Sequence, residues 1–171
     1  RTIDAQGQAI VASGLVSVPV KAGGAASPVL SYQHGTIEQD SEAPTNRATV
    51  EEPAVVLASL GYIVVAADYV GYGASKGTPH PYLLSAPTAA AVIDLLTAAK
   101  TWRLRNGVAD NGQLFLIGYS EGGYATMAAH RALQSTGGAL LASLVASAPG
   151  AGPYDIGVTL DGWVSDAAVT V

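Results

Sequence analysis

The feature that most constrains this chain is a serine between two glycines, placed where an apolar strand should pass into a helix. Leu114–Ile117 predicts a buried strand, and Gly118-Tyr119-Ser120-Glu121-Gly122 follows it directly. A serine at such a turn adopts a strained backbone conformation, and Gly118 and Gly122 avoid Cβ clashes across the bend. The turn would hold the Ser120 hydroxyl above the sheet, at the positive end of a helix dipole. We predict that Ser120 is a nucleophile; the alternative is a glycine-rich turn with a capping serine.

Strands and helices alternate along the rest of the chain. Tyr62–Ala67 is a continuous apolar run, of the kind buried on both faces of a parallel sheet. Ser85–Trp102 carries an apolar stripe at spacings of three and four residues, which predicts a long helix. The expected strands are 9–20, 28–33, 62–67, 113–119 and 140–147, and the expected helices are 53–60, 85–102 and 122–134. This order predicts an α/β fold with a mostly parallel sheet and helices on both faces. No helix is expected near Val171.

Composition argues against several classes of protein. The 171 residues carry 8 basic and 13 acidic side chains, and the net charge of -5 argues against binding to nucleic acid or to an anionic membrane. Hydrophobic residues make up 49% of the chain and charged residues 12%, so most of it should fold around one core. No apolar run is long enough to span a bilayer. With no cysteine, and with three histidines that lack paired spacing, neither a metal site nor a cofactor is expected.

Three motifs together resemble the α/β-hydrolases, most of all the secreted lipases and carboxylesterases. They are Ser31-Tyr32-Gln33-His34-Gly35-Thr36, the stretch Asp68–Ser75 and Gly118–Gly122, within a resemblance that covers roughly Ser17–Ile156. His80–Leu83 and Pro149–Asp155 are also similar to those lipases. The resemblance implies a serine esterase that acts on small-molecule or lipid esters through an acyl-enzyme on Ser120. It also implies export from the cell, which for a bacterial source means a periplasmic or secreted enzyme.

The same resemblance implies an oxyanion hole, which stabilises the negative charge that acyl transfer creates. In the family, an HG-type turn after a strand donates one backbone N–H, and the residue after the nucleophile donates the other. By position, these donors are Thr36 and Glu121, with His34 and Gly35 supporting the turn. His34 would lie on the oxyanion side of the serine, so we do not expect it to be the catalytic base. A solvent-facing His34 is the alternative.

The catalytic triad is incomplete in this sequence. In this fold the acid and then the histidine follow the serine, yet the only histidine after Ser120 is His130, about 15 Å further along one helix. Asp155, Asp161 and Asp166 come one strand too early for the usual acid. We therefore predict that residues 1–171 are the N-terminal portion of a single catalytic domain. A cap, the acid and the histidine would lie beyond residue 171, and that part would complete the sheet.

The remaining features have structural interpretations. Asp68 should accept N–H bonds from the glycine-rich turn that follows it, and His80 should lie at the rim of the pocket. The acidic residues Glu38, Asp40 and Glu42 predict a solvated loop, with a calcium site as the weaker alternative. Two other functions stay open. One is a peptidase of the same fold, and the other is a non-catalytic binding protein that retains the turn at Ser120 without a triad.

Overall fold

Five strands form one sheet in the order β3–β5–β4–β6–β7. The computed structural model describes residues 1–169, and its sheet comprises β3 (Gly14–Ser17), β4 (Ser27–Gln33), β5 (Ile63–Ala67), β6 (Asp110–Tyr119) and β7 (Leu144–Gly150). β3 is antiparallel to β5, and the other pairs are parallel. The short strands β1 (Thr2–Ile3) and β2 (Ala9–Ile10) pair with each other. The mostly parallel sheet is confirmed, although the expected strand 9–20 is divided between β2 and β3.

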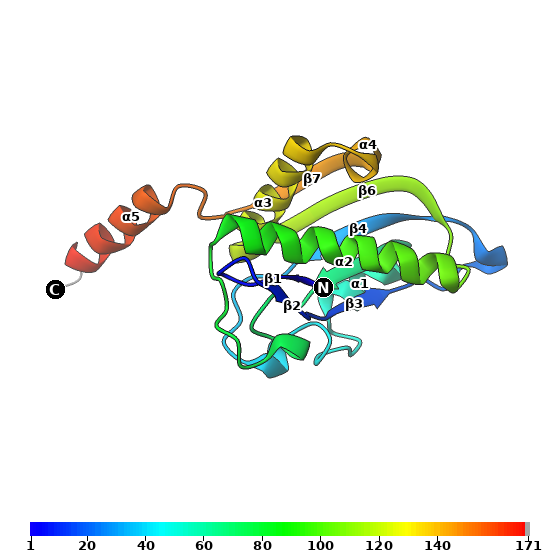
Figure 1. Cartoon of the computed structure of the whole chain (residues 1–171), viewed down its shortest axis with the longest axis horizontal. Helices are drawn as coiled ribbons and strands as arrows, with labels where there is room; N and C mark the ends of the chain where they lie inside the picture. Colours follow the sequence, from blue (N-terminus) through cyan, green and yellow to red (C-terminus); the bar gives the residue numbers. More distant parts are fainter. Residues whose placement is uncertain (170–171) are drawn as a thin grey trace.

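Helices cover both faces of the sheet (Figure 1). The helices are α1 (Pro53–Ser59), α2 (Ser85–Arg105), α3 (Glu121–Thr136), α4 (Ala139–Ser143) and α5 (Ile156–Val169). Side chains alternate along β5, so Ile63 and Val65 pack with α2 and α3 while Val64 and Ala66 pack with α1. All five residues of β5 are buried, as expected for a strand that lies between two layers of helices.

The predicted strand 140–147 is confirmed only in its second half. Ala139–Ser143 forms α4, and the strand β7 runs from Leu144 to Gly150. Gly137 and Gly138 have φ values of 71° and 88°, so they end α3 and redirect the chain. The sequence Ala-Leu-Leu-Ala-Ser that follows favours a helix, and the β-branched Val145 comes only after it. In an apolar run this short, the pattern of residues alone does not distinguish a helix from a strand.

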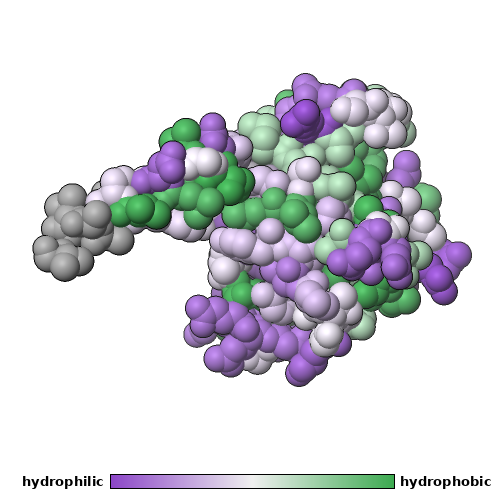
Figure 2. Space-filling model, turned by 60° about the vertical axis from the view of Figure 1, so that its left-hand side comes forward, coloured by the Kyte–Doolittle hydropathy of each residue, from purple (hydrophilic) through white to green (hydrophobic). Residues whose placement is uncertain are grey.

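The helix α5 was not expected from the sequence, and it projects away from the sheet (Figure 1). Asp155 caps its start, because its Oδ1 accepts the N–H of Val158 at 3.0 Å. In the part of α5 up to residue 165, the apolar side chains are largely exposed, with Trp163 at 59% and Val164 at 70%, and Figure 2 shows apolar surface on this projecting segment. No helix in the described part of the chain is long and apolar enough to cross a membrane.

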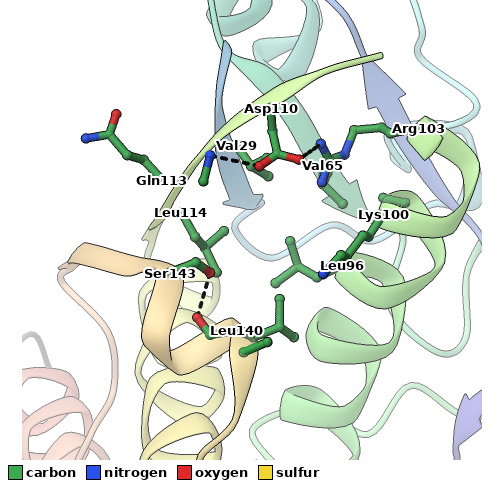
Figure 3. A pocket seen from close by; sticks show the side chains of 13 residues that line it. Val29, Val65, Leu96, Lys100, Arg103, Asp110, Gln113, Leu114, Leu140 and Ser143 are labelled. Atoms are coloured by element: carbon green, nitrogen blue, oxygen red, sulfur yellow. Dashed lines mark hydrogen bonds and ion pairs between the residues drawn. The ribbon is translucent and has the colours of Figure 1, made fainter. Parts of the chain in front are cut away.

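A partly buried ion pair joins α2 to β6 at the amino ends of the strands. Arg103 is 6% exposed and binds the Asp110 carboxylate. This contact lowers the pKa of Asp110. The pair borders a cavity of about 150 Å³ that Val29, Leu114 and Leu140 also line (Figure 3). The cavity lies at the opposite end of β6 from Ser120.

Asp68 ties three segments together at the carboxyl end of β5. Its buried carboxylate accepts the Ser13 hydroxyl at 2.6 Å, and the N–H and hydroxyl of Thr45 at 2.9 and 2.6 Å. The expected bonds from the glycine-rich turn are absent among the described residues. Gly73 instead approaches so closely that a Cβ atom there would lie 2.4 Å from the carboxylate, and its N–H donates to Asp40. The turn therefore needs glycine for close approach to Asp68 rather than for hydrogen bonding.

Replacing Asp68 by asparagine should destabilise the protein by about 1–3 kcal/mol, because an amide NH₂ would then face the Thr45 donors inside the core. Urea denaturation measures the change. Glu51→Gln is the matched control at an exposed position, where we expect a change within about 0.5 kcal/mol. Equal stability of the two variants would show that the Asp68 contacts contribute nothing.

Candidate active site

Ser120 connects the end of β6 to the start of α3 in a strained conformation. Its φ of 57° and ψ of -124° lie outside the regions that non-glycine residues favour. Its backbone N–H donates to the Gly150 carbonyl at 2.9 Å, which attaches the turn to the end of β7. Strain of this kind persists only where neighbouring structure holds it, and such residues cluster at functional sites. The expected strand–turn–helix geometry around Ser120 is present.

The glycines around Ser120 allow the turn to pack against backbone. A Cβ atom at Gly118 would lie 2.2 Å from the Gly122 carbonyl oxygen, and one at Gly122 would lie 2.0 Å from the Gln33 carbonyl oxygen. A Cβ atom at Gly123 would lie 2.3 Å from the Gly150 oxygen. The turn is thus packed closely between the end of β4 and the end of β7.

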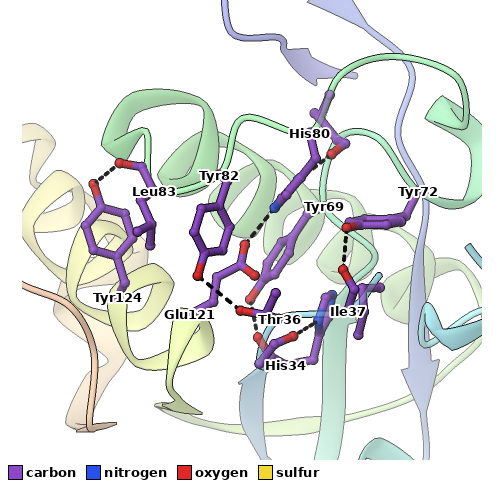
Figure 4. Close-up of polar contacts among 12 residues, drawn as sticks. His34, Thr36, Ile37, Tyr69, Tyr72, His80, Tyr82, Leu83, Glu121 and Tyr124 are labelled. Atoms are coloured by element: carbon purple, nitrogen blue, oxygen red, sulfur yellow. Dashed lines mark hydrogen bonds and ion pairs between the residues drawn. The ribbon is translucent and has the colours of Figure 1, made fainter. Parts of the chain in front are cut away.

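The predicted oxyanion turn lies directly beside Ser120. An ideal Cβ atom built on Gly35 would be 3.8 Å from the Ser120 Cβ atom. The Tyr69 hydroxyl donates to the His34 carbonyl at 3.1 Å and thereby anchors the turn (Figure 4). Within residues 1–169, the backbone N–H groups of Thr36 and Glu121 donate to no other protein group.

His34 is buried, so the solvent-facing alternative is wrong. Its side chain is 6% exposed, its Nδ1 lies 2.7 Å from the Gly35 carbonyl, and its ring centroid lies 4.2 Å from that of Tyr69. Burial lowers the pKa of His34, although the bond to Gly35 opposes this, so the ring is neutral at neutral pH. These contacts support the turn.

His80 lies deeper than the rim position expected from the sequence. Its Nε2 is 2.7 Å from the Glu121 Oε1, and the Glu121 side chain is 3% exposed. Sequence reasoning missed this pair because the two residues are 41 positions apart. Only two features of the sequence pointed to this pair. His80 lies in a stretch that is similar to the lipases, and Glu121 is an acidic residue directly after Ser120.

Comparison with known proteins identifies the family of this chain. The model of the secretory lipase family matches residues 38–164. The chain belongs to the secretory lipase family. The esterase LipA from Xanthomonas oryzae, which degrades rice cell walls, is 35% identical over 90% of this chain and 41% of its own, with a TM-score of 0.80. Candida antarctica lipase A shares 22% identity over 86% of the chain and 35% of its own, with a TM-score of 0.59, and shows the fold alone.

The chain thus spans about two fifths of the length of LipA. No curated protein is a match to the sequence.

The other predicted polar residues belong to α3 or lie at α5. His130 is a partly buried residue of α3, and Asp155 caps α5. Asp161 lies in α5, and the side chain of Asp166 falls outside the described part of the structure. Across the described residues, no group of three His, Cys, Asp or Glu side chains could hold a metal ion.

The acidic loop, which we expected to be only solvated, is held by hydrogen bonds and an ion pair. Asp40 accepts the Gly73 N–H at 2.7 Å and lies 3.1 Å from the Lys76 Nζ. Glu42 accepts the N–H groups of Glu38 and Gln39. These backbone hydrogen bonds lower the pKa of both Asp40 and Glu42.

Substituting Gly122 by alanine should severely destabilise the protein or prevent its folding, because the new methyl group would overlap the backbone of Gln33. Thermal unfolding measures the effect. Gly162→Ala is the matched control, since Gly162 lies in α5 with ordinary helical backbone and open space for 4 Å around the position of an added methyl group. We expect the control to be neutral or more stable by up to about 1 kcal/mol. A well-folded Gly122→Ala variant would contradict the packing described above.

Proposed function

We propose that this secretory lipase is a serine hydrolase that cleaves carboxylic esters through an acyl-enzyme on Ser120. The observation that supports this best is Ser120 at a φ of 57°, next to two unpaired backbone N–H groups at Thr36 and Glu121. A strained serine at the end of a strand, beside donors that bind no protein group, is the arrangement that acyl transfer requires.

In the proposed reaction, the Ser120 hydroxyl attacks the ester carbonyl carbon and gives its proton to a histidine. The carbonyl oxygen becomes negative and binds the N–H groups of Thr36 and Glu121, each worth about 3–4 kcal/mol. The alcohol leaves with the proton from the histidine, and water then attacks the acyl group and restores Ser120. The N-terminal end of α3 adds a favourable dipole at the same place.

We propose that the triad acid and histidine belong to a further part of the protein. His34 and His80 use their rings for other contacts, and His130 lies about 15 Å along α3 from Ser120. The relative LipA is more than twice as long as the segment that aligns with this chain. Residues 1–171 then form the N-terminal portion of a single catalytic domain.

Exposed apolar surface supports the same proposal. Val145 on β7, at the edge of the described sheet, is 55% exposed, and the apolar residues of α5 are also uncovered. Exposed strand edges and apolar faces are normally covered in folded proteins. The further part would supply strands beside β7 and a cap that contacts α5.

The substrate class follows from the family. We propose that the substrate is a small-molecule or lipid ester, and that the enzyme is exported from the cell. Membership of a family described as secretory lipases supports both statements.

A fluorophosphonate should label Ser120 in the full-length protein, because such reagents react with activated serines. Mass spectrometry of the labelled peptide locates the adduct, and labelling should disappear in Ser120→Ala. The matched control Ser135→Ala changes an exposed serine of α3 and should label normally. A chain of residues 1–171 alone should label about a thousandfold more slowly, because it lacks the base. If the full-length protein takes up no label, it is a binding protein of this fold instead.

A further inference from the structure

The residue that carries one of the proposed oxyanion donors, Glu121, also has a buried carboxylate. Glu121 directly follows Ser120, donates its own N–H to the site in the proposed reaction, and has a side chain that is 3% exposed. A negative charge at this position opposes the negative charge that must develop on the substrate oxygen, and burial strengthens that repulsion. A buried carboxylate is also costly by itself unless it is paired.

His80 supplies the matching positive charge. Its Nε2 lies 2.7 Å from the Glu121 Oε1, and its Nδ1 lies 2.7 Å from the Val70 carbonyl oxygen. A carbonyl oxygen only accepts hydrogen bonds, so the contact with Val70 places a proton on Nδ1. With Glu121 as a carboxylate, the contact at Nε2 places a second proton on the ring, and the pair is then an imidazolium and a carboxylate.

The surroundings of the pair favour the charged form. Burial alone would lower the pKa of His80, but its hydrogen bonds to Glu121 and Val70 raise that pKa above 6.5. The titratable groups around the His80 ring are Glu121 and three tyrosines, whose ring centroids lie 6.0 Å (Tyr69), 5.1 Å (Tyr72) and 6.1 Å (Tyr82) away (Figure 4). Burial raises the pKa of Tyr69 and Tyr72, so they stay neutral and present aromatic rings to the cation.

The backbone holds His80 in this place. Gly71 has a φ of 104°, and a Cβ atom there would lie 2.9 Å from the His80 Cβ. The ring therefore packs on the loop after β5 while it reaches the first residue of α3. It links the loop after β5 to the residue that carries one of the proposed oxyanion donors.

We infer that His80 is a positioning residue that neutralises Glu121 beside the oxyanion site and holds the Glu121 N–H in place for the reaction. This inference rests on the proposed function. The pair is intact below the raised pKa of His80 and is lost as pH rises through it. Loss of the proton leaves an uncompensated carboxylate next to the developing oxyanion, so kcat should fall on the basic side. The catalytic histidine must be neutral to act as a base, so it produces the opposite, acidic limb.

The test measures kcat and KM of the full-length protein for p-nitrophenyl butyrate across pH. His80→Gln should lower kcat about 10- to 100-fold with little change in KM, because the unpaired charge acts mainly on the transition state. Adding Glu121→Gln to His80→Gln removes that charge, so the double variant should regain about tenfold in kcat. The basic limb of the wild-type profile should be missing from both the double variant and Glu121→Gln. His130→Gln, a histidine of α3 away from the site, should behave as wild type.

A purely structural role predicts a different pattern. The double variant would then be as slow as His80→Gln or slower, and the basic limb would persist in Glu121→Gln; either result overturns the inference. If His80→Gln does not fold, the pH profile of Glu121→Gln alone decides. Fluorophosphonate labelling of the wild type distinguishes failure of the proposed function from failure of this inference. Absence of label overturns the proposed function. A labelled enzyme whose kcat is unchanged in His80→Gln overturns only the role of His80.

Discussion

Close approach of bare backbone at the turn around Ser120 is the constraint on which the rest of the site depends. Because Gly118 and Gly122 have no side chains, the end of β6 and the start of α3 can pack against the Gln33 carbonyl at the end of β4. The bond from the Ser120 N–H to Gly150 attaches the same turn to β7. Neighbouring strands thus hold a conformation that an isolated peptide would not keep. The oxyanion turn at Gly35 gains its position from the same contacts.

Buried charges hold the loops that surround this turn. Asp68 binds Ser13 and Thr45, and Glu121 binds His80, so each carboxylate joins segments that are distant in the sequence. A buried carboxylate is expensive without partners, so each one specifies the loop arrangement that satisfies it. The two differ in their consequences. Asp68 has only neutral donors and serves the fold, whereas Glu121 has a histidine as its partner and directly follows Ser120, the proposed nucleophile.

The described sheet is well packed on the side of β5 and open on the side of β7. β5 is buried throughout, whereas Val145 on β7 and Trp163 on α5 remain exposed. This asymmetry agrees with the alignment to LipA, in which the chain covers 41% of the relative's length. The nucleophile and the oxyanion donors of the proposed mechanism lie at the carboxyl ends of β4 and β6, inside the sheet, where neighbouring strands already set their geometry.

The sequence by itself determined the features that depend on adjacent residues. The turn at Ser120 depends on the two glycines next to it, and β5 and α2 depend on the apolar pattern of their own residues. The turn, the strand and the helix could therefore be predicted. The sequence did not show where α4 ends and β7 begins, because a short run of alanine and leucine can form either a helix or a strand. Only the tertiary structure decided which group neutralises Glu121 and which donors satisfy Asp68. The partner of a buried charge is chosen by long-range packing, and residues 41 positions apart carry no local sign that they will meet.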